Sequence, residues 1–310
     1  MGLSRVAAFL TLAMVLIAAT DPAKAQEFDT FKRMKATETI IVGYRDVSSP
    51  FSYLDSNKEP IGYSIDLCLK IVDAIRTSQQ LPRLAVKWTM VTRAARIPMV
   101  ANGTVDIECG STTNTVERQQ QVGFANTTFV AATRLAFKKS AKIKSLEDLK
   151  GKLVVAVAGT TNLKQINAVN LKRKLQMKVA PVKDNAKAFE MVQSGEAVAF
   201  GTDDILLYDM IANSAAPGDY EVSVDPLSVE PYGIMLRKDD AAMKKVADDT
   251  LNALFKSGEI NKIYSKWFLS PIPPKNIVLH AAMSDALKKA IAEPKSSALP
   301  SDYSSDEFFK

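Results

Sequence analysis

The stretch VDIECGSTTNTVERQQQVGFA, residues 105–125, combines the local signals that decide the fold of this chain. It opens with a short apolar run, typical of a buried strand, that ends at Gly110. Asn114, with Glu117 three positions later, is typical of a helix N-cap with its capping-box partner. Between strand and helix lies a cluster of hydroxyl side chains, made of Ser111, Thr112, Thr113 and Thr115. The stretch therefore predicts a strand that leads through a hydroxyl-rich turn into a helix.

Arg118 falls in the first turn of that predicted helix, close to the hydroxyl cluster. The first amides of a helix have no partner within the helix, and its dipole favours an anion at this end. A guanidinium group binds both oxygens of a carboxylate at once. We interpret the turn, the helix start and Arg118 as a cradle for a carboxylate.

The alternation of apolar runs and amphipathic segments extends along most of the chain. Before Phe129 it predicts strands over 40–42, 84–88 and 105–109, and helices over 66–76 and 94–100. After Phe129 it predicts strands over 153–158, 177–181 and 198–200, and helices that begin near 162, 185 and 203. Two further helices are predicted over 241–256 and 259–268. This pattern is typical of an α/β fold with mostly parallel sheets, and its two blocks predict two lobes.

The first 25 residues have the features of a cleaved export signal. Arg5 precedes the apolar run Val6–Thr20, and Ala23-Lys24-Ala25 is a typical cleavage site. The run of about 15 residues is shorter than the roughly 20 that a membrane-spanning helix needs. We therefore expect a signal peptide over 1–25 and an exported mature protein, with a retained N-terminal anchor as the alternative.

Composition narrows the classes of function. About 285 mature residues exceed one typical core, which again predicts two domains. The net charge of +6 falls to +5 without the signal, and it is spread along the chain, so nucleic-acid binding has no support. A single histidine, His280, argues against Ser-His-Asp catalysis and a His-rich metal site. Cys68 and Cys109 are either a disulfide or two buried free thiols.

Several separated segments resemble the periplasmic amino-acid-binding proteins of ABC importers, solute-binding protein family 3, and most of all their glutamate/aspartate-binding branch. They include GYSIDLCLKIV (62–72), residues 111–125, LEDLKGKLVVAVAGTT (146–161), FGTDDILL (200–207), SGEINKIYSKWF (257–268) and PIPPKN (271–276). The resemblance implies a two-lobed type II periplasmic binding protein fold with two extended hinge crossings, near 125–129 and 229–233. It places lobe 1 at 28–127 plus 232–296, lobe 2 at 128–231 and a loose C-terminal tail at 297–310.

The same resemblance assigns roles in an amino-acid site. Arg118 would pair with the ligand α-carboxylate, with Thr113 and the amides around Thr161 as further donors. Asp203 and Ser111 would accept hydrogen bonds from the α-ammonium. Arg45 and Arg96 would bind a second carboxylate, on the ligand side chain.

Two positions depart from the glutamate/aspartate pattern. Arg93 stands where that pattern has a serine, and Asn185 stands where it has a histidine. Arg93 adds positive charge, whereas Asn185 donates a hydrogen bond but never as a cation. Phe51 is expected to pack on the methylenes of the ligand.

The sequence thus predicts a monomeric solute-binding protein that captures an acidic L-amino acid and delivers it to a membrane permease, without catalysis, cofactor or metal. One alternative is an exported dehydratase-like or lyase-like enzyme on the same fold, with Asp203 or Asp204 as its acid. We expect the surrounding arginines to keep these carboxylates ionised instead. The other alternative is a binding protein for a different polar amino acid or a dicarboxylate.

Overall fold

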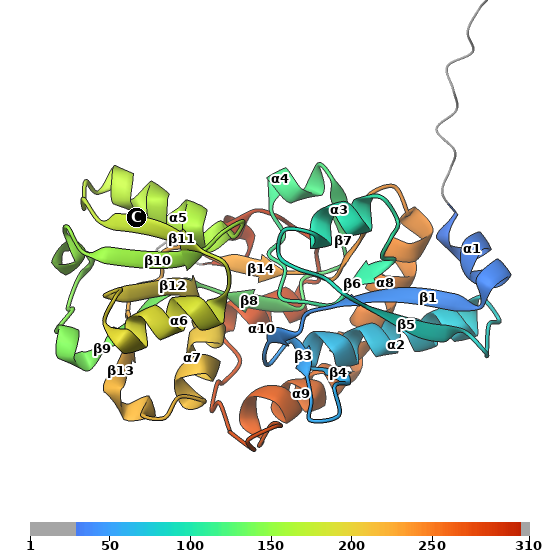
Figure 1. Ribbon diagram of the computed structural model, residues 1–310. Coiled ribbons are helices and arrows are strands. Elements are labelled where there is room, and N and C mark those ends of the chain that lie inside the picture. Colours follow the sequence, from blue (N-terminus) through green and yellow to red (C-terminus); the bar gives the residue numbers. More distant parts are fainter. Residues whose placement is uncertain (1–28, 305–310) are drawn as a thin grey trace, which may run out of the picture.

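The computed structural model describes residues 29–304, which form two lobes built on separate five-stranded sheets (Figure 1). The first sheet has the order β5-β1-β6-β15-β7. Its strands are β1 (Thr39–Tyr44), β5 (Ala85–Met90), β6 (Ile107–Glu108), β7 (Val122–Phe124) and β15 (Met235–Arg237). The helices of this lobe are α1 (Thr30–Thr37), α2 (Tyr63–Ser78), α3 (Arg96–Ala101), α4 (Val116–Gln119), α8 (Ala241–Ser257) and α9 (Glu259–Tyr264). A small three-stranded sheet adds β2 (Val47–Ser48), β3 (Ser52–Leu54) and β4 (Pro60–Ile61).

The second sheet has the order β11-β10-β12-β9-β13. Its strands are β9 (Thr133–Lys138), β10 (Leu153–Val157), β11 (Lys178–Val182), β12 (Ala199–Asp203) and β13 (Tyr220–Val222). Helices α5 (Thr161–Lys172), α6 (Asn185–Ser194) and α7 (Asp204–Ala212) connect and flank these strands. A capping box of Ser145 and Asp148 opens a 3-10 helix, Leu146–Leu149. The two-lobed α/β fold predicted from the sequence is therefore confirmed.

Two short antiparallel strands connect the lobes. β8 (Phe129–Ala131) pairs with β14 (Glu230–Tyr232), and both lie between the two sheets in Figure 1. An aromatic cluster anchors them to the first lobe, because Phe51 lies 4.8 Å from Phe129 and 5.1 Å from Tyr232, measured between ring centroids. The Tyr63 hydroxyl also donates to the carbonyl oxygen of Thr128 at 2.8 Å. Phe51 is fully buried in this cluster, and its expected role against the ligand methylenes stays a prediction.

Each sheet is mixed rather than purely parallel. β1 pairs in parallel with β5 and β6, and β10 pairs in parallel with β11 and β12, as the βα rhythm predicts. β15 and β9 pair antiparallel with their neighbours, because the chain has just crossed the hinge when it forms them. The βα rhythm read from the sequence includes neither of these two strands.

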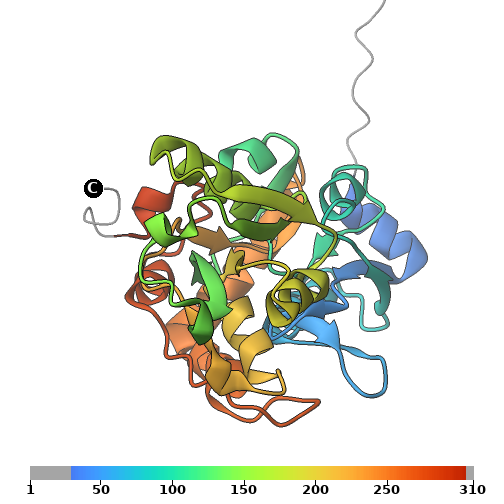
Figure 2. The ribbon, with the colours of Figure 1, turned by 60° about the vertical axis from the view of Figure 1, so that its left-hand side comes forward.

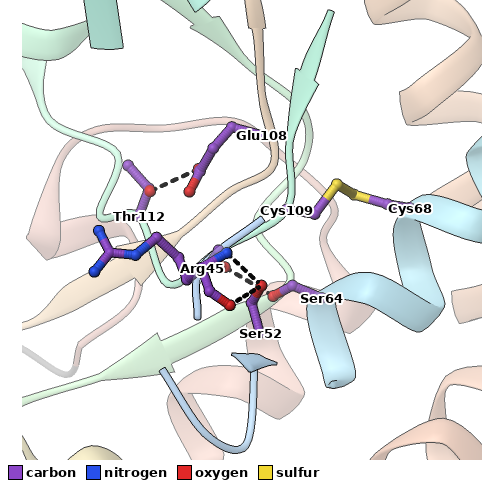
Figure 3. The surroundings of a disulfide bond; sticks show 8 residues. Arg45, Ser52, Ser64, Cys68, Glu108, Cys109 and Thr112 are labelled. Carbon is purple, nitrogen blue, oxygen red and sulfur yellow. Dashed lines mark hydrogen bonds between the residues drawn. A yellow bond between two sulfur atoms is a disulfide. The ribbon is translucent and has the colours of Figure 1, made fainter. Parts of the chain in front are cut away.

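Cys68 and Cys109 form a disulfide bond, which decides between the two alternatives left open by the sequence. The bond joins α2 to the residue that follows β6, and Figure 3 shows it beside Arg45 and Glu108. Gly110 follows directly and leads into the hydroxyl cluster. A covalent bond therefore fixes the start of the predicted carboxylate cradle.

The C-terminal part of the chain packs against the hinge. Helix α10 (Asp285–Ala292) contacts β8, and a 3-10 helix follows over Pro300–Asp302. Figure 2 shows this red segment on the side of the molecule away from blue α1. Tyr303 is 1% exposed, so the loose tail expected over 297–310 is wrong for residues up to 304. Residues 305–310, like the predicted signal peptide, lie outside the described residues. Between residues 29 and 304, no helix combines the length and apolar character that a membrane span requires.

We expect the disulfide to contribute strongly to stability. It closes a loop across a sequence separation of 41, which corresponds to about 4 kcal/mol of lost entropy in the unfolded chain. The double variant Cys68→Ala/Cys109→Ala should therefore unfold at clearly lower urea concentration than the wild type. Equal unfolding midpoints at equal slope would contradict this contribution.

Candidate functional site

A narrow polar cavity lies between the two lobes. The first lobe lines it with Arg93, Arg96, Ser111, Thr113 and Arg118. The second lobe lines it with Thr160, Thr161, Asn162, Thr202, Asp203 and Leu206. All the site residues predicted from the sequence, except Arg45 and Asn185, thus meet at one narrow cavity.

The turn before α4 holds Arg118 in place. Thr115 is the N-cap of α4, and its hydroxyl accepts a hydrogen bond from the Arg118 amide at 3.2 Å. The Arg118 guanidinium donates through Nη1 to the carbonyl oxygen of Thr113 at 2.7 Å. Asn114 is not the cap that the sequence predicted, because its side chain instead donates to the carbonyl oxygens of Ser296 and Ser297. Burial, followed by repulsion from Arg96, lowers the pKa of Arg118 to about 10.

The start of α5 forms the facing wall. Thr160 is its N-cap and accepts from the Leu163 amide at 3.2 Å, so simple capping accounts for Thr160. The Thr161 hydroxyl oxygen lies 3.5 Å from that of Thr113, on the other lobe. Thr113 and Thr161 therefore present hydroxyls from opposite lobes to the same point, beside the free amides and positive end of the α5 dipole.

Arg96 and Arg45 lie together at the edge of the first sheet. Arg96 donates through Nη1 to the Thr112 hydroxyl at 2.6 Å, and Thr112 donates to Glu108 Oε2 at 2.8 Å. Arg45 is 4% exposed, and its Nε and Nη1 have no hydrogen-bond partner. Burial and repulsion from Arg96 lower its pKa. Figure 3 shows the Arg45 guanidinium on the same side as Thr112, and Arg45 is not among the residues that line the cavity.

Gly110 makes this close packing possible. A Cβ atom at this position would collide with Glu108 Oε1 and lie 3.0 Å from Arg45 Cγ. Any larger residue at position 110 would therefore have to displace the side chains of Glu108 and Arg45.

Arg93 adds a further positive charge to the cavity. Its pKa is lowered to about 10 by burial, and then by repulsion from Arg45 and Arg96. The guanidinium groups of Arg45, Arg93 and Arg96 thus lie close enough to repel one another, while Glu108 acts on Arg45 and Asp203 acts on Arg93. An anion in the cavity would relieve this repulsion.

Asp203 supplies the negative end of the cavity. It occupies the N-cap position of α7 without capping it; its Oδ1 accepts from Asn162 Nδ2 at 2.9 Å and its Oδ2 accepts from the Tyr232 hydroxyl. Burial and repulsion from Glu230 raise the pKa of Asp203 to about 7. The expectation that nearby arginines keep this carboxylate ionised is therefore wrong for the ligand-free site. A cationic group placed beside Asp203 would favour its charged form.

Asn185 does not line the cavity. It lies at the start of α6 and lines a neighbouring pocket with Asp46 and Asp209, which shares only Leu206 with the cavity. Its Oδ1 is buried without a hydrogen-bond partner. The sequence alone did not reveal that Asn185 lies in this neighbouring pocket and not in the cavity.

Several residues of the site were not predicted from the sequence. Tyr232 and Glu230 lie on the hinge strand β14, and Glu108 ends β6. Each is a polar residue in an otherwise apolar, buried strand, which is the signal that marks them. In the described part of the chain, no group of three or more His, Cys, Asp or Glu side chains is arranged to hold a metal ion.

Comparison with known proteins identifies the family. The sequence model of the bacterial extracellular solute-binding proteins, family 3, matches residues 40–270. The chain belongs to this family. It is 50% identical to the L-glutamate/L-aspartate-binding protein of Pseudomonas aeruginosa, over 93% of this chain and 96% of that protein. It is 42% identical to the glutamate/aspartate import solute-binding protein of Escherichia coli, over 94% of this chain and 97% of that protein.

Solved structures of this family share its fold. An ancestral arginine-binding protein bound to arginine matches with a TM-score of 0.66 and 29% identity, over 74% of this chain and 98% of that chain. An ancestral amino-acid-binding protein, described as a precursor of cyclohexadienyl dehydratase, matches with a TM-score of 0.65 and 29% identity, over 77% and 99%. The curated relatives at 42–50% identity are binding proteins and not enzymes.

The raised pKa of Asp203 predicts how the stability of the ligand-free protein depends on pH. Because the folded pKa, about 7, exceeds the ordinary value of 3.8, the contribution of Asp203 is fully present below about pH 4. It is lost as the pH rises through 7, by at most about 4 kcal/mol. The Asp203→Asn variant lacks this loss. Its free energy of unfolding should therefore rise relative to that of the wild type between pH 4 and pH 7.5. Urea unfolding at a series of pH values measures this difference, and parallel curves would contradict the assignment.

Proposed function

We propose that this protein binds an acidic L-amino acid, glutamate or aspartate, between its two lobes and delivers it to the membrane permease of an ABC importer. The observation that carries the proposal is the group of buried guanidiniums that faces Asp203 across one small cavity. The printed functions of the relatives from Pseudomonas aeruginosa and Escherichia coli support the same ligand class.

The charges that line the cavity support an acidic ligand. Three guanidinium groups line it, those of Arg93, Arg96 and Arg118, and Asp203 is the one carboxylate among its lining residues. Glu108 and Glu230 also act on Arg118 from behind the lining, and Asp46 acts on Arg45. An acidic amino acid places its second carboxylate against this local excess of guanidinium charge, whereas a neutral amino acid does not.

The ligand groups map onto the two ends of the cavity. The α-carboxylate lies against Arg118, with Thr113 and Thr161 as donors from opposite lobes. The α-ammonium lies against Asp203, with Ser111 as a neutral acceptor. The side-chain carboxylate lies against Arg96 and Arg93, and Arg45 supports them from behind. Asn185 stays outside this set unless closure moves it toward the ligand.

Contacts from both lobes favour the closed arrangement. Charge-assisted hydrogen bonds contribute on the order of 1.5–3 kcal/mol each, so a few reach the roughly −8 kcal/mol of a micromolar complex. Ser49 donates to Asp209 at 2.9 Å across the lobes and adds a direct contact. The pair of Lys164 and Glu117, at 2.5 Å, also joins the lobes but is too exposed to contribute much. A permease can then distinguish the loaded, closed protein from the empty one.

We further propose that the protein acts as a monomer in the periplasm after removal of residues 1–25. Lobe 1 then comprises 28–127 plus 232–296, and lobe 2 comprises 128–231. The activity requires no cofactor, metal, nucleic acid or catalytic step.

Titration calorimetry tests the ligand class. L-glutamate is added to protein that has been unfolded and refolded to remove carried-over ligand. We expect a dissociation constant, Kd, in the micromolar range or tighter, with aspartate as a competitor. Absence of binding by glutamate and aspartate, with tight binding of a neutral amino acid, would contradict the proposal.

Two substitutions separate the proposed roles of the arginines. Arg118→Ala removes the partner of the α-carboxylate, so it should abolish binding of every amino acid, at a cost of about 3–5 kcal/mol. Arg45→Ala acts only on the side-chain end, so it should weaken acidic ligands while it leaves the weak binding of glutamine nearly unchanged. Calorimetry with glutamate and glutamine on both variants measures this. An equal loss of affinity for glutamate and glutamine in Arg45→Ala would contradict this division of roles.

A further inference from the structure

A C-terminal strap, residues 294–304, lies across the back of the hinge. The Thr127 amide donates to the carbonyl oxygen of Lys295 at 2.9 Å, just before β8 begins. Figure 1 shows the red end of the described chain behind β14 and β8, in the region between the two sheets. The strap lies beyond residue 270, where the match to the family model ends.

The strap binds the back of the carboxylate cradle. Asn114 is 1% exposed, and its Nδ2 donates to the carbonyl oxygens of Ser296 and Ser297 at 3.0 and 3.3 Å. Gln119 Nε2 donates to the same Ser296 oxygen at 3.0 Å and to Asn114 Oδ1 at 2.9 Å. These side chains come from both ends of the short helix that carries Arg118. The strap thus closes a buried polar network around that helix.

Asn114 also connects the strap to the residues that hold Arg118. Its neighbours in sequence are Thr113, whose carbonyl oxygen accepts from the Arg118 guanidinium, and Thr115, whose hydroxyl accepts from the Arg118 amide. The Asn114 amide donates to the carbonyl oxygen of Pro231 on β14 at 2.7 Å. A shift of Asn114 therefore moves both partners of Arg118 and the hinge strand together.

Tyr303 fixes the far end of the strap to the hinge. Its hydroxyl lies 2.8 Å from the Thr127 hydroxyl and donates to the Ser297 carbonyl oxygen at 3.0 Å. Its ring packs in a buried cluster with Val130 of β8 and Val229, which precedes β14. The strap therefore contacts both crossings between the lobes, as well as the cradle.

We propose that the C-terminal strap is a positioning element of the ligand site, which holds Arg118 through Asn114 and constrains the hinge through Tyr303. This role rests on the proposed function and adds to it. A guanidinium that is held before the ligand arrives loses less freedom on binding, so the strap raises affinity by preorganisation. Because Arg118 acts on the α-carboxylate that all amino acids share, the strap affects every ligand by the same factor.

A merely structural strap would lower the melting temperature, Tm, and leave affinity unchanged. The test uses Asn114→Ala, which cuts the connection to the cradle, and Tyr303→Phe, which removes the hydroxyl but keeps the buried ring. Asp302→Asn is the matched control, because it removes only the half-exposed pair with Lys295 at 3.8 Å within the strap. Calorimetry measures Kd for L-glutamate and L-aspartate on each variant.

We expect Asn114→Ala to raise both Kd values by about tenfold, with their ratio unchanged. Tyr303→Phe should raise them in the same sense by a smaller factor, and Asp302→Asn should match the wild type. Wild-type Kd values in both Asn114→Ala and Tyr303→Phe would overturn the proposal, whatever their Tm. If Asn114→Ala does not fold, Gln119→Ala replaces it, since it removes one bond to Ser296 and leaves Asn114 in place.

A second measurement needs no ligand and so separates this proposal from the proposed function. Spin labels at the exposed positions Lys87 and Leu171, one on each lobe, report the distance between the lobes. If the wild type binds neither glutamate nor aspartate, the proposed function fails and this distance decides the role of the strap. A broader distance distribution in Tyr303→Phe than in the wild type supports the role, and identical distributions overturn it.

Discussion

The structure depends on one electrostatic constraint, which is the confinement of like charges between two lobes. Arg93, Arg96 and Arg118 line the same small cavity, and Arg45 lies buried beside them. Burial and mutual repulsion lower the pKa of Arg93 and Arg118 to about 10. The site without a ligand therefore disfavours their charged forms. At the other end, burial raises the pKa of Asp203. An amino-acid zwitterion with an additional carboxylate places negative charge beside the arginines and positive charge beside Asp203. It does both at once only when the lobes lie close together.

The fold brings these charges together from distant parts of the chain. Arg45 follows β1 and Arg118 lies on α4, whereas Asp203 ends β12 in the other lobe. The carboxyl ends of parallel strands are where α/β folds usually place their ligands. The disulfide of Cys68 and Cys109 fixes the point where β6 leads into the cradle, and Gly110 gives the space for that turn. β8 and β14 then allow the lobes to close on the ligand while they keep the two halves in register.

Much of this arrangement is predictable from the sequence, because the βα rhythm and the ordered motifs are local. The remainder depends on contacts between distant segments. Asn114 has the sequence features of a helix cap, yet its side chain binds Ser296, so Thr115 takes the capping role. The raised pKa of Asp203 depends on its burial and then on Glu230, which belongs to the hinge strand β14. Tyr303 lies in a polar C-terminal stretch whose sequence predicts a loose tail. In the structure its ring packs on Val130 and Val229. β9 and β15 likewise owe their antiparallel direction to the crossings and not to their own residues.

The most direct test of this account is the ratio of the affinities for L-glutamate and L-glutamine, two ligands of nearly equal shape that differ by one charge. If the local excess of guanidinium charge decides the ligand, glutamate binds at least about tenfold more tightly, since one charged hydrogen bond alone contributes on the order of 1.5–3 kcal/mol. Equal affinities, or tighter binding of glutamine, would contradict the account, because the buried arginines would then be balanced within the protein itself.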